Sequence, residues 1–378
     1  MRNLTVPLAR RLLGLARSNE QGAIGVLIAV LMAGGVLIGM GALVVDVGQI
    51  YQERAELQNG ADAAALGVAK SCALGACAPG VASGLADANA SKLTRGTAAV
   101  GQVCGSGNLG ACPPSAGAPT NCPPPPTGVN YVEVSTSTRT AGGSTLLPPV
   151  FARTLLGNSG YQGSNVVACA QAEWGAPVAA TTVAVTISAC AWDQATQQGT
   201  FFPPGPPYPP DPAPSPAADQ VITLNAGPGG GGCATEPAGA DGPGFAWVAH
   251  PRGNCTVPIS GLSFQGRPQL SVSFSCELVL ENAQQSQASI LVPVYVASSG
   301  APGNPTYTLK GFAEFVVTGY NLPGFNGSTV DAPDWLNPAN NCQGSDYCLN
   351  GYFVQGVIPY TGNIGGTSLG VSVISLTG

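Results

Sequence analysis

An uninterrupted run without charged residues, from Gln21 to Val45, constrains this chain more than any other feature of the sequence. Its 25 residues are enough to cross the hydrocarbon core of a bilayer as a helix, for which about 20 apolar residues suffice. Cytoplasmic flanks carry the excess of Lys and Arg, so we expect a single-pass transmembrane helix with residues 1–20 inside and everything after Val47 outside. The basic residues that precede the run are Arg2, Arg10, Arg11 and Arg17, and acidic residues follow it from Asp46. A cleaved signal peptide is the alternative, but its apolar core would have roughly 7–15 residues.

The helical pattern continues beyond the apolar run. We expect one continuous helix over about 24–70, in which Gly60 costs about 1 kcal/mol relative to Ala, and in which Glu53 lies off the apolar stripe. Gly35 and Gly39 have the GxxxG spacing of helix-packing faces, although glycine is also simply frequent in membrane helices, and the pattern leaves both explanations open. The stripe recurs at three- and four-residue steps and consists of Val47, Ile50, Leu57, Ala61, Ala64, Ala65 and Val68.

The low charge of the chain argues against several classes of function. Only 8% of the 378 residues are charged, and 13 Lys and Arg against 19 Asp and Glu give a net charge of -6. Such a chain lacks the basic surface that nucleic-acid binding requires. His250, the single histidine, has no Ser, Cys or carboxylate pattern of a catalytic triad around it. We therefore expect a non-enzymatic protein without a nucleic-acid partner, cofactor or metal.

The 12 cysteines indicate disulfides and an oxidising compartment, because no CxxC pair of the kind typical of zinc sites occurs. A short, turn-rich loop favours the pairing of Cys342 with Cys348. The sequence does not fix the connectivity, so several further pairs remain candidates. These are Cys72 with Cys77, Cys104 with Cys112, Cys233 with Cys255, and Cys190 with Cys276.

Composition divides the chain into six segments. A basic tail (1–20) and the helix (21–70) precede residues 71–128, whose Gly, Ala, Pro and Cys content predicts a tether. Strand-like runs predict a β-rich exported domain in two parts, 129–200 and 233–378, with a short helix at 146–157. Proline and glycine runs predict a linker or loop over 201–232. The strand-like runs lie at 129–140, 164–174, 181–192, 289–298, 306–321, 351–360 and 369–377.

A specific motif follows the apolar run, in the stretch VVDVGQIYQERAELQNGADAAALGVA from Val44 to Ala69. It combines Asp-x-Gly-x-x-Tyr, an Arg, and Leu-Gln-Asn-x-Ala-Asp-Ala-Ala-Ala. The residues that form it are Asp46, Gly48, Tyr51, Arg54, Leu57, Gln58, Asn59, Asp62, Ala63, Ala64 and Ala65. This arrangement closely resembles the TadE/TadG-like proteins of bacterial Flp (tight adherence, Tad) pilus systems. Some longer members contain a von Willebrand factor A-like domain with an Asp-x-Ser-x-Ser metal motif, and no such triplet occurs here.

The resemblance implies an α+β fold, with a long pilin-like transmembrane helix followed by a mostly β exported region with disulfides and Pro/Gly-rich loops. It implies a component of Flp/Tad-type pilus assembly or a related secretion system in the bacterial cytoplasmic membrane. The expected partners are other pilus-assembly or pseudopilin-like membrane proteins and the lipid bilayer, and a homo-oligomer is also allowed. The alternative is a membrane-tethered surface adhesion protein that is not required for pilus building. For Asp46, three alternatives remain open: a functional intramembrane carboxylate, a side chain that faces solvent at the membrane interface, and a structural role such as registering helices.

Overall fold

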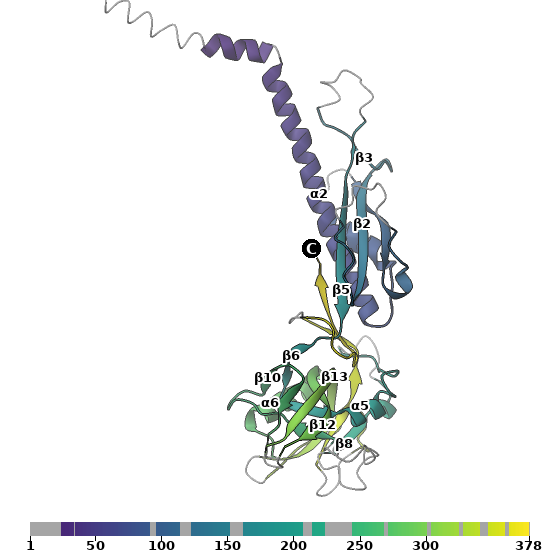
Figure 1. Cartoon of the computed structure of the whole chain (residues 1–378), viewed down its shortest axis with the longest axis vertical. Helices are drawn as coiled ribbons and strands as arrows, with labels where there is room; N and C mark the ends of the chain where they lie inside the picture. The colour runs from purple at the N-terminus through teal and green to yellow at the C-terminus, as the bar shows by residue number, and fades with distance from the viewer. Residues whose placement is uncertain are drawn as a thin grey trace, which may run out of the picture.

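The computed structural model describes residues 24–33, 35–90, 96–113, 122–151, 162–206, 214–223, 244–267, 271–300, 304–324, 328–340, 347–359 and 363–377. The fold is mixed α+β and mostly β toward the C-terminus, as the sequence predicts. Figure 1 shows a long helix that ends on one β-rich unit, with a second, larger β-rich unit beyond it. We call these the N-terminal unit and the C-terminal unit.

The N-terminal helix is interrupted, which corrects the prediction of one continuous helix. Residues 24–33 are helical, and a second helix, α2 (Val36–Ala73), begins after Gly35. Gly35 has φ 69°, a left-handed conformation that glycine adopts at little cost, so the backbone changes direction there (Figure 1). Within the part of the chain that the structure describes, no helix is both long and apolar enough to cross a membrane.

The N-terminal unit is a five-stranded sheet covered on one face by helices. α2 and the short helix α3 (Val81–Ala90) pack against this sheet through their small and apolar residues. Along the second strand every other residue from Val132 to Thr138 is buried, which gives the period of two expected when one sheet face is covered. The sheet has the order β1 (Gly96–Gly105), β2 (Asn130–Thr140), β5 (Val167–Gly175), β17 (Val371–Leu376) and β16 (Gly356–Ile358).

The prediction of a tether over residues 71–128 is therefore wrong in part, because these residues contribute both α3 and β1 to the N-terminal unit. The alanines of α3 are small enough to bring that helix close to α2, which composition alone does not reveal. The predicted helix at 146–157 is also wrong at its start. Leu146–Leu147 forms strand β3, paired with β4 (Ser164–Asn165), and residues 152–157 lie outside the described part.

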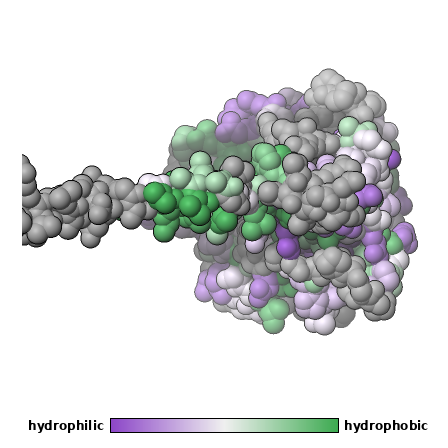
Figure 2. All heavy atoms as spheres, turned by 90° about the horizontal axis from the view of Figure 1, so that it is seen from above, coloured by the Kyte–Doolittle hydropathy of each residue, from purple (hydrophilic) through white to green (hydrophobic). Residues whose placement is uncertain are grey.

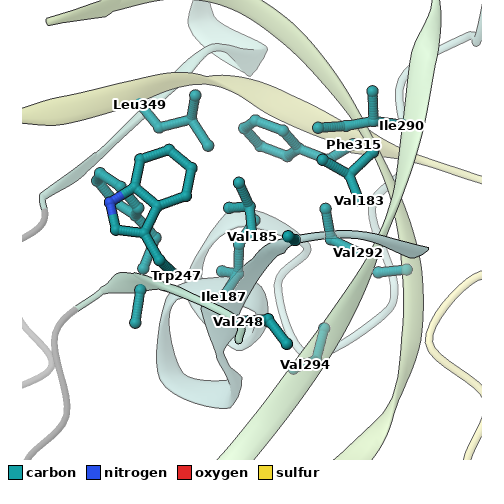
Figure 3. Close-up of a cluster of buried hydrophobic side chains, with 14 of the residues drawn as sticks. Val183, Val185, Ile187, Trp247, Val248, Ile290, Val292, Val294, Phe315 and Leu349 are labelled. Atoms are coloured by element: carbon teal, nitrogen blue, oxygen red, sulfur yellow. The ribbon is translucent and has the colours of Figure 1, made fainter. Parts of the chain in front are cut away.

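The C-terminal unit is built on an eight-stranded sheet. Its core contains large aromatic and branched side chains, among them Trp247, Phe315 and Val292 (Figure 3). The main path is β8 (Gln220–Thr223), β15 (Cys348–Val354), β13 (Thr306–Pro323), β12 (Ser289–Ser299), β7 (Val185–Ser188) and β9 (Phe245–Trp247). β11 (Ser263–Gln265) and β14 (Thr329–Ala332) pair with β13, and β6 (Ala179–Val183) pairs with β10 (Thr256–Ser260). Helices α5 (Ala189–Ala195) and α6 (Phe274–Ser286) and the 3-10 turn η2 (Pro216–Ala218) complete this unit. A further 3-10 turn, η1 (Gly107–Leu109), follows β1 in the N-terminal unit.

The border between the units does not follow the predicted division at 201–232. The chain leaves the N-terminal sheet after β5 and enters the C-terminal unit at β6. It returns through β16 and β17, which pair with each other, and β17 pairs with β5 through Val373 to Leu376. The C-terminal unit is thus inserted between two strands of the N-terminal sheet, because the last apolar strand completes the first sheet.

Four disulfides join described cysteines. The local pairs Cys72–Cys77 and Cys104–Cys112 are present. Two candidate pairs are wrong, because Cys255 bonds to Cys276 rather than to Cys233, and so Cys276 does not bond to Cys190. A fourth bridge, Cys122–Cys169, spans 47 residues and was not among the candidates. Cys190 and Cys348 are also disulfide-bonded. Cys342, the predicted partner of Cys348, lies outside the described residues, as does Cys233.

Candidate functional site: the two faces of helix α2

The buried face of α2 is formed by the small residues of the motif. Leu57, Ala64 and Ala65 have no exposed surface, and Ala61 and Val68, one turn away, are equally buried. With 3.6 residues per turn, these positions fall on one side of the helix, which lies against β2, β5 and α3. The motif therefore describes, first of all, a helix surface flat enough for a sheet and a second helix.

Polar residues of the same helix fix its position on the sheet. The Gln58 side chain donates to the backbone carbonyl of Cys169 in β5 and to Asp62 Oδ1, both at 2.9 Å. From β2, the Thr136 hydroxyl donates to the carbonyl of Leu57 at 3.0 Å. These directional contacts set the register of α2 along the strands, which apolar packing alone leaves loosely defined.

Asp46 is buried, with 8% of its surface exposed, and its carboxylate accepts backbone hydrogen bonds from a distant loop. Oδ1 accepts from the amides of Val150 at 2.7 Å and Phe151 at 3.1 Å, and Oδ2 also accepts from Phe151 at 3.2 Å. A charged acceptor makes these bonds stronger than bonds between neutral groups. Asp46 thus holds the loop after β3 against α2. This geometry fits a structural role of the Asp46 carboxylate.

Glu53 is a buried polar residue that the sequence pattern placed wrongly. It lies off the predicted stripe, but it is 6% exposed, and its Oε1 accepts from the Thr138 hydroxyl at 2.8 Å. The apolar pattern could not identify it, since a glutamate at this position is equally compatible with a solvated surface.

The outward face of α2 carries the other motif residues. Gly48, Tyr51, Arg54 and Asn59 are exposed, Tyr51 to 71%, although a tyrosine ring is commonly packed. Asp62 and Ala63 are half-buried at the margin of the packed surface. A Cβ added at Gly35, Gly39 or Gly48 would meet nothing within 4 Å, so these glycines make no close packing contact within the described part of the chain. We call the set Gly48, Tyr51, Arg54 and Asn59 the outward motif face.

Apolar side chains without cover occupy the helical residues before this face. The strongly hydrophobic end of the molecule is seen in Figure 2, which looks from the side where the helix projects. The exposed residues are Ile24, Val26, Leu27, Ile28, Val30, Met32, Val36, Met40, Leu43, Val44, Val45 and Val47. A contiguous apolar surface of this kind marks a site of contact with a membrane or a partner protein.

The other candidates for chemistry have structural partners. His250 Nδ1 lies 3.0 Å from the carbonyl of Pro251, and its Nε2 lies 3.2 Å from the Ser273 hydroxyl. Ser273 is also the N-cap of α6, where its Oγ accepts from the Cys276 amide. Sequence reasoning missed this contact because 23 residues separate the two side chains.

Two groups of close ligand atoms surround Glu133, namely Cys104 with Cys112 and Cys122 with Cys169. All four sulfurs are in disulfides, so none is available as a thiolate ligand. Burial raises the pKa of Glu133, and a hydrogen bond with Gln171 opposes this effect.

Comparison with known protein families gives a match to the N-terminal segment. No curated protein and no solved structure matched the chain. The family model described as Flp pilus-assembly TadE/G-like matches residues 22–71, which include the exposed apolar helix, Asp46 and both faces of α2 up to Ser71. The chain therefore carries a TadE/G-like Flp pilus-assembly segment at residues 22–71.

Proposed function

We propose that this protein is a non-enzymatic, membrane-anchored component of a Flp/Tad-type pilus assembly or related secretion system. Its N-terminal apolar segment would be covered by lipid and by helices of other pilus-assembly or pseudopilin-like proteins. Residues 1–20 would remain in the cytoplasm, and the two β-rich units would lie outside the bacterial cytoplasmic membrane, where disulfides are stable.

The observation that carries the proposal is the difference in burial between the two halves of the matched segment. From Leu57 onward one side of the helix is buried within its own chain, whereas from Ile24 to Val47 many of its apolar side chains are exposed. At about 25 cal/mol per Å² of apolar surface, covering this surface is strongly favourable, so the segment needs a lipid or protein environment. The outward motif face continues from that surface and offers Tyr51 and Arg54 to a partner helix.

Site-specific crosslinking in the native host tests the partner. A photo-crosslinking amino acid at Tyr51 is expected to capture a second pilus-assembly protein. The matched control is the same amino acid at Leu262, which is 83% exposed but lies in the C-terminal unit. Equal capture of the same proteins from both positions would argue against a specific outward motif face.

Gene deletion separates pilus assembly from the adhesion alternative. Deleting the gene is expected to abolish or strongly reduce pili in electron micrographs, and the unaltered gene should restore them. Normal pili combined with loss of surface attachment would contradict the assembly role and favour a tethered adhesion protein.

Membrane anchoring is checked separately: the full chain should resist alkaline extraction from membranes, and a chain lacking residues 24–47 should not.

A further inference from the structure

The N-terminal unit has an uncharged end on the side from which the helix projects, where β3 lies (Figure 1). Residues 140–151 form this end, which comprises the turn after β2, strand β3 and the start of the loop that Asp46 holds. No Asp, Glu, Lys or Arg occurs among them. Hydrogen bonds define the turn, in which the Thr140 amide donates to the carbonyl of Ser144 and the Gly143 amide to that of Thr140, both at 2.8 Å. We call residues 140–151 the uncharged tip.

Hydrogen bonds to α2 show which part of the helix lies beside the tip. From β2, the Thr136 hydroxyl donates to the carbonyl of Leu57. Two residues closer to the tip, the Thr138 hydroxyl donates to Glu53, which lies about one turn closer to the helix N-terminus. Asp46 lies about two further turns in the same direction and accepts from the last two residues of the tip. The uncharged tip is therefore level with Asp46, at the end of the charge-free run.

Exposed apolar side chains continue from the helix onto the tip. On α2, Val45 and Val47 flank Asp46 in the sequence, and both are exposed. Phe151 of the tip is 44% exposed, although large apolar side chains are most often buried, and Pro148 is exposed as well. The Asp46 carboxylate accepts from the Phe151 amide at 3.1 Å, so these side chains belong to one end of the unit. The apolar surface of the helix thus extends to a residue 105 positions later in the chain.

We propose that the uncharged tip rests on the outer surface of the membrane in which the apolar helix is anchored, with Phe151 at the boundary between head groups and acyl chains. The inference rests on the membrane anchoring given under the proposed function. If the charge-free run lies in the lipid, its end at Asp46 lies near the head groups, and the tip lies at the same level. Phenylalanine is typical of the apolar side of segments that lie in this boundary.

The charges at and beside the tip fit a lipid surface. Arg139, the residue before the tip, is exposed and forms no ion pair within the described part of the chain. A cation at the level of the head groups is attracted to anionic lipids. The tip itself carries no charge that would lose its hydration on contact with the membrane. Attachment at both the helix and the tip fixes the tilt of the N-terminal unit relative to the membrane, which a single helix does not.

Photo-crosslinking in proteoliposomes of phosphatidylethanolamine and phosphatidylglycerol tests this contact with the full, disulfide-bonded chain. The photo-reactive p-benzoylphenylalanine replaces Phe151, and lipid adducts are measured by mass spectrometry. The matched control is the same replacement at Phe274, which is 67% exposed but lies in the C-terminal unit. Replacement of Leu43, an exposed residue of the apolar run, reports on membrane anchoring itself. Lipid adducts are expected at Leu43 and Phe151, severalfold above those at Phe274.

The outcomes separate this inference from the proposed function. Adducts at Leu43 without adducts at Phe151, or equal adducts at Phe151 and Phe274, would overturn the contact of the tip and leave membrane anchoring intact. A lack of lipid adducts at Leu43 would contradict the anchoring and, with it, the contact of the tip. Capture of a second copy of the chain at Phe151, in place of lipid, would show that the tip is a protein contact and would also overturn the inference.

Asp46 is a positioning residue in this arrangement. Asp46→Ala should lower the lipid adducts at Phe151 severalfold and leave those at Leu43 unchanged, because the loop loses the acceptor that holds it. Thr136→Val, which removes the contact with Leu57 elsewhere on α2, is the control and should change neither. An equal loss of adducts in both variants would show that reduced stability determines the result, and would overturn the role of Asp46.

Discussion

Asp46 and Asp219 are both almost fully buried carboxyl groups, but their hydrogen-bond partners differ in kind. Asp46 accepts hydrogen bonds from the backbone amides of Val150 and Phe151. Asp219 lies beside a second carboxyl group, Asp334, and the Thr318 hydroxyl lies 2.7 Å from Asp219 Oδ1 and 3.1 Å from Asp334 Oδ2. The single hydroxyl hydrogen can serve only one of these contacts, so the cluster needs another proton.

Replacing Asp46 by alanine should destabilise the N-terminal unit by about 1–3 kcal/mol, because the Val150 and Phe151 amides lose a charged acceptor. Asp46→Asn keeps one oxygen acceptor and should cost less. Urea denaturation followed by far-UV circular dichroism measures both variants. Equal stabilities of wild type and Asp46→Ala would show that the carboxylate does not anchor the loop.

The Asp219 pair predicts a pH dependence of stability. Burial, followed by the hydrogen bond with Asp334, raises the pKa of Asp219 to about 7. An aspartate in the unfolded chain has a pKa of about 3.9, so the folded state binds the extra proton between about pH 4 and pH 7. The stability contributed by this proton is fully present below about pH 4 and is lost as the pH rises through about 7.

Asp219→Asn should therefore flatten this pH dependence and stabilise the protein by about 1–3 kcal/mol at pH 8 relative to wild type at the same pH. The measurement is the urea midpoint of both chains from about pH 4 to pH 8. Glu314, whose pKa is also raised by burial, provides a second source of the same trend, so the difference between the two profiles is the informative quantity. Parallel profiles would contradict the assignment.

At the scale of the elements, the contact between α2 and α3 depends on glycine. A Cβ added at Gly60 would lie 2.7 Å from the backbone oxygen of Ala86 and 3.2 Å from Cβ of Ala90. Both neighbours are part of α3, and a backbone oxygen cannot move without shifting the whole helix. The close approach of α2 and α3 thus explains why glycine occupies position 60, although its helix propensity is poor.

Gly60→Ala should destabilise the protein by about 1–3 kcal/mol through overpacking, although alanine gains about 1 kcal/mol in helix propensity. Gly84→Ala in α3 is the matched control, since nothing lies within 4 Å of its added Cβ, and it should be stabilising. Thermal unfolding of the two variants distinguishes the effects. If both substitutions stabilised the protein, the helices would not be packed as closely as the structure indicates.

At the scale of the whole molecule, the strand β17 brings the C-terminal part of the sequence back to the N-terminal unit. β17 pairs with β5, and its Ile374 packs against the core of the N-terminal unit, about 200 residues from the strand that it joins. The two units therefore cannot be separated by a single cut in the chain. The N-terminal unit depends on residues that follow the whole C-terminal unit.

Removing residues 371–378 should destabilise the N-terminal unit selectively. The amides of β5 should exchange with solvent faster, because β17 no longer pairs with them, whereas those of β12 and β13 should be little affected. Hydrogen exchange measured by mass spectrometry tests this, with a chain shortened only by Gly378 as the control. Equal acceleration in both units would indicate that β17 supports the whole molecule rather than one sheet.

The sequence by itself determined the features that depend on near neighbours. The three- and four-residue stripe from Leu57 to Val68 predicts the buried side of α2, and the alternation after Asn130 predicts β2. The motif that resembles TadE/TadG-like proteins predicts the family of the N-terminal segment, which the family model matches. A helix or strand imposes its own period on the residues that it buries, so these features are visible without the rest of the chain.

Only the tertiary structure decided which distant residues meet. The break at Gly35, the bridge from Cys122 to Cys169, the loop held by Asp46 and the return of β17 all depend on how elements pack. So does the polar pocket beside Tyr320, whose lining comes mainly from the three strands β13, β14 and β15. Closing a longer loop costs only slightly more entropy, so spacing along the chain barely restricts such partners, and the packing of the units selects them.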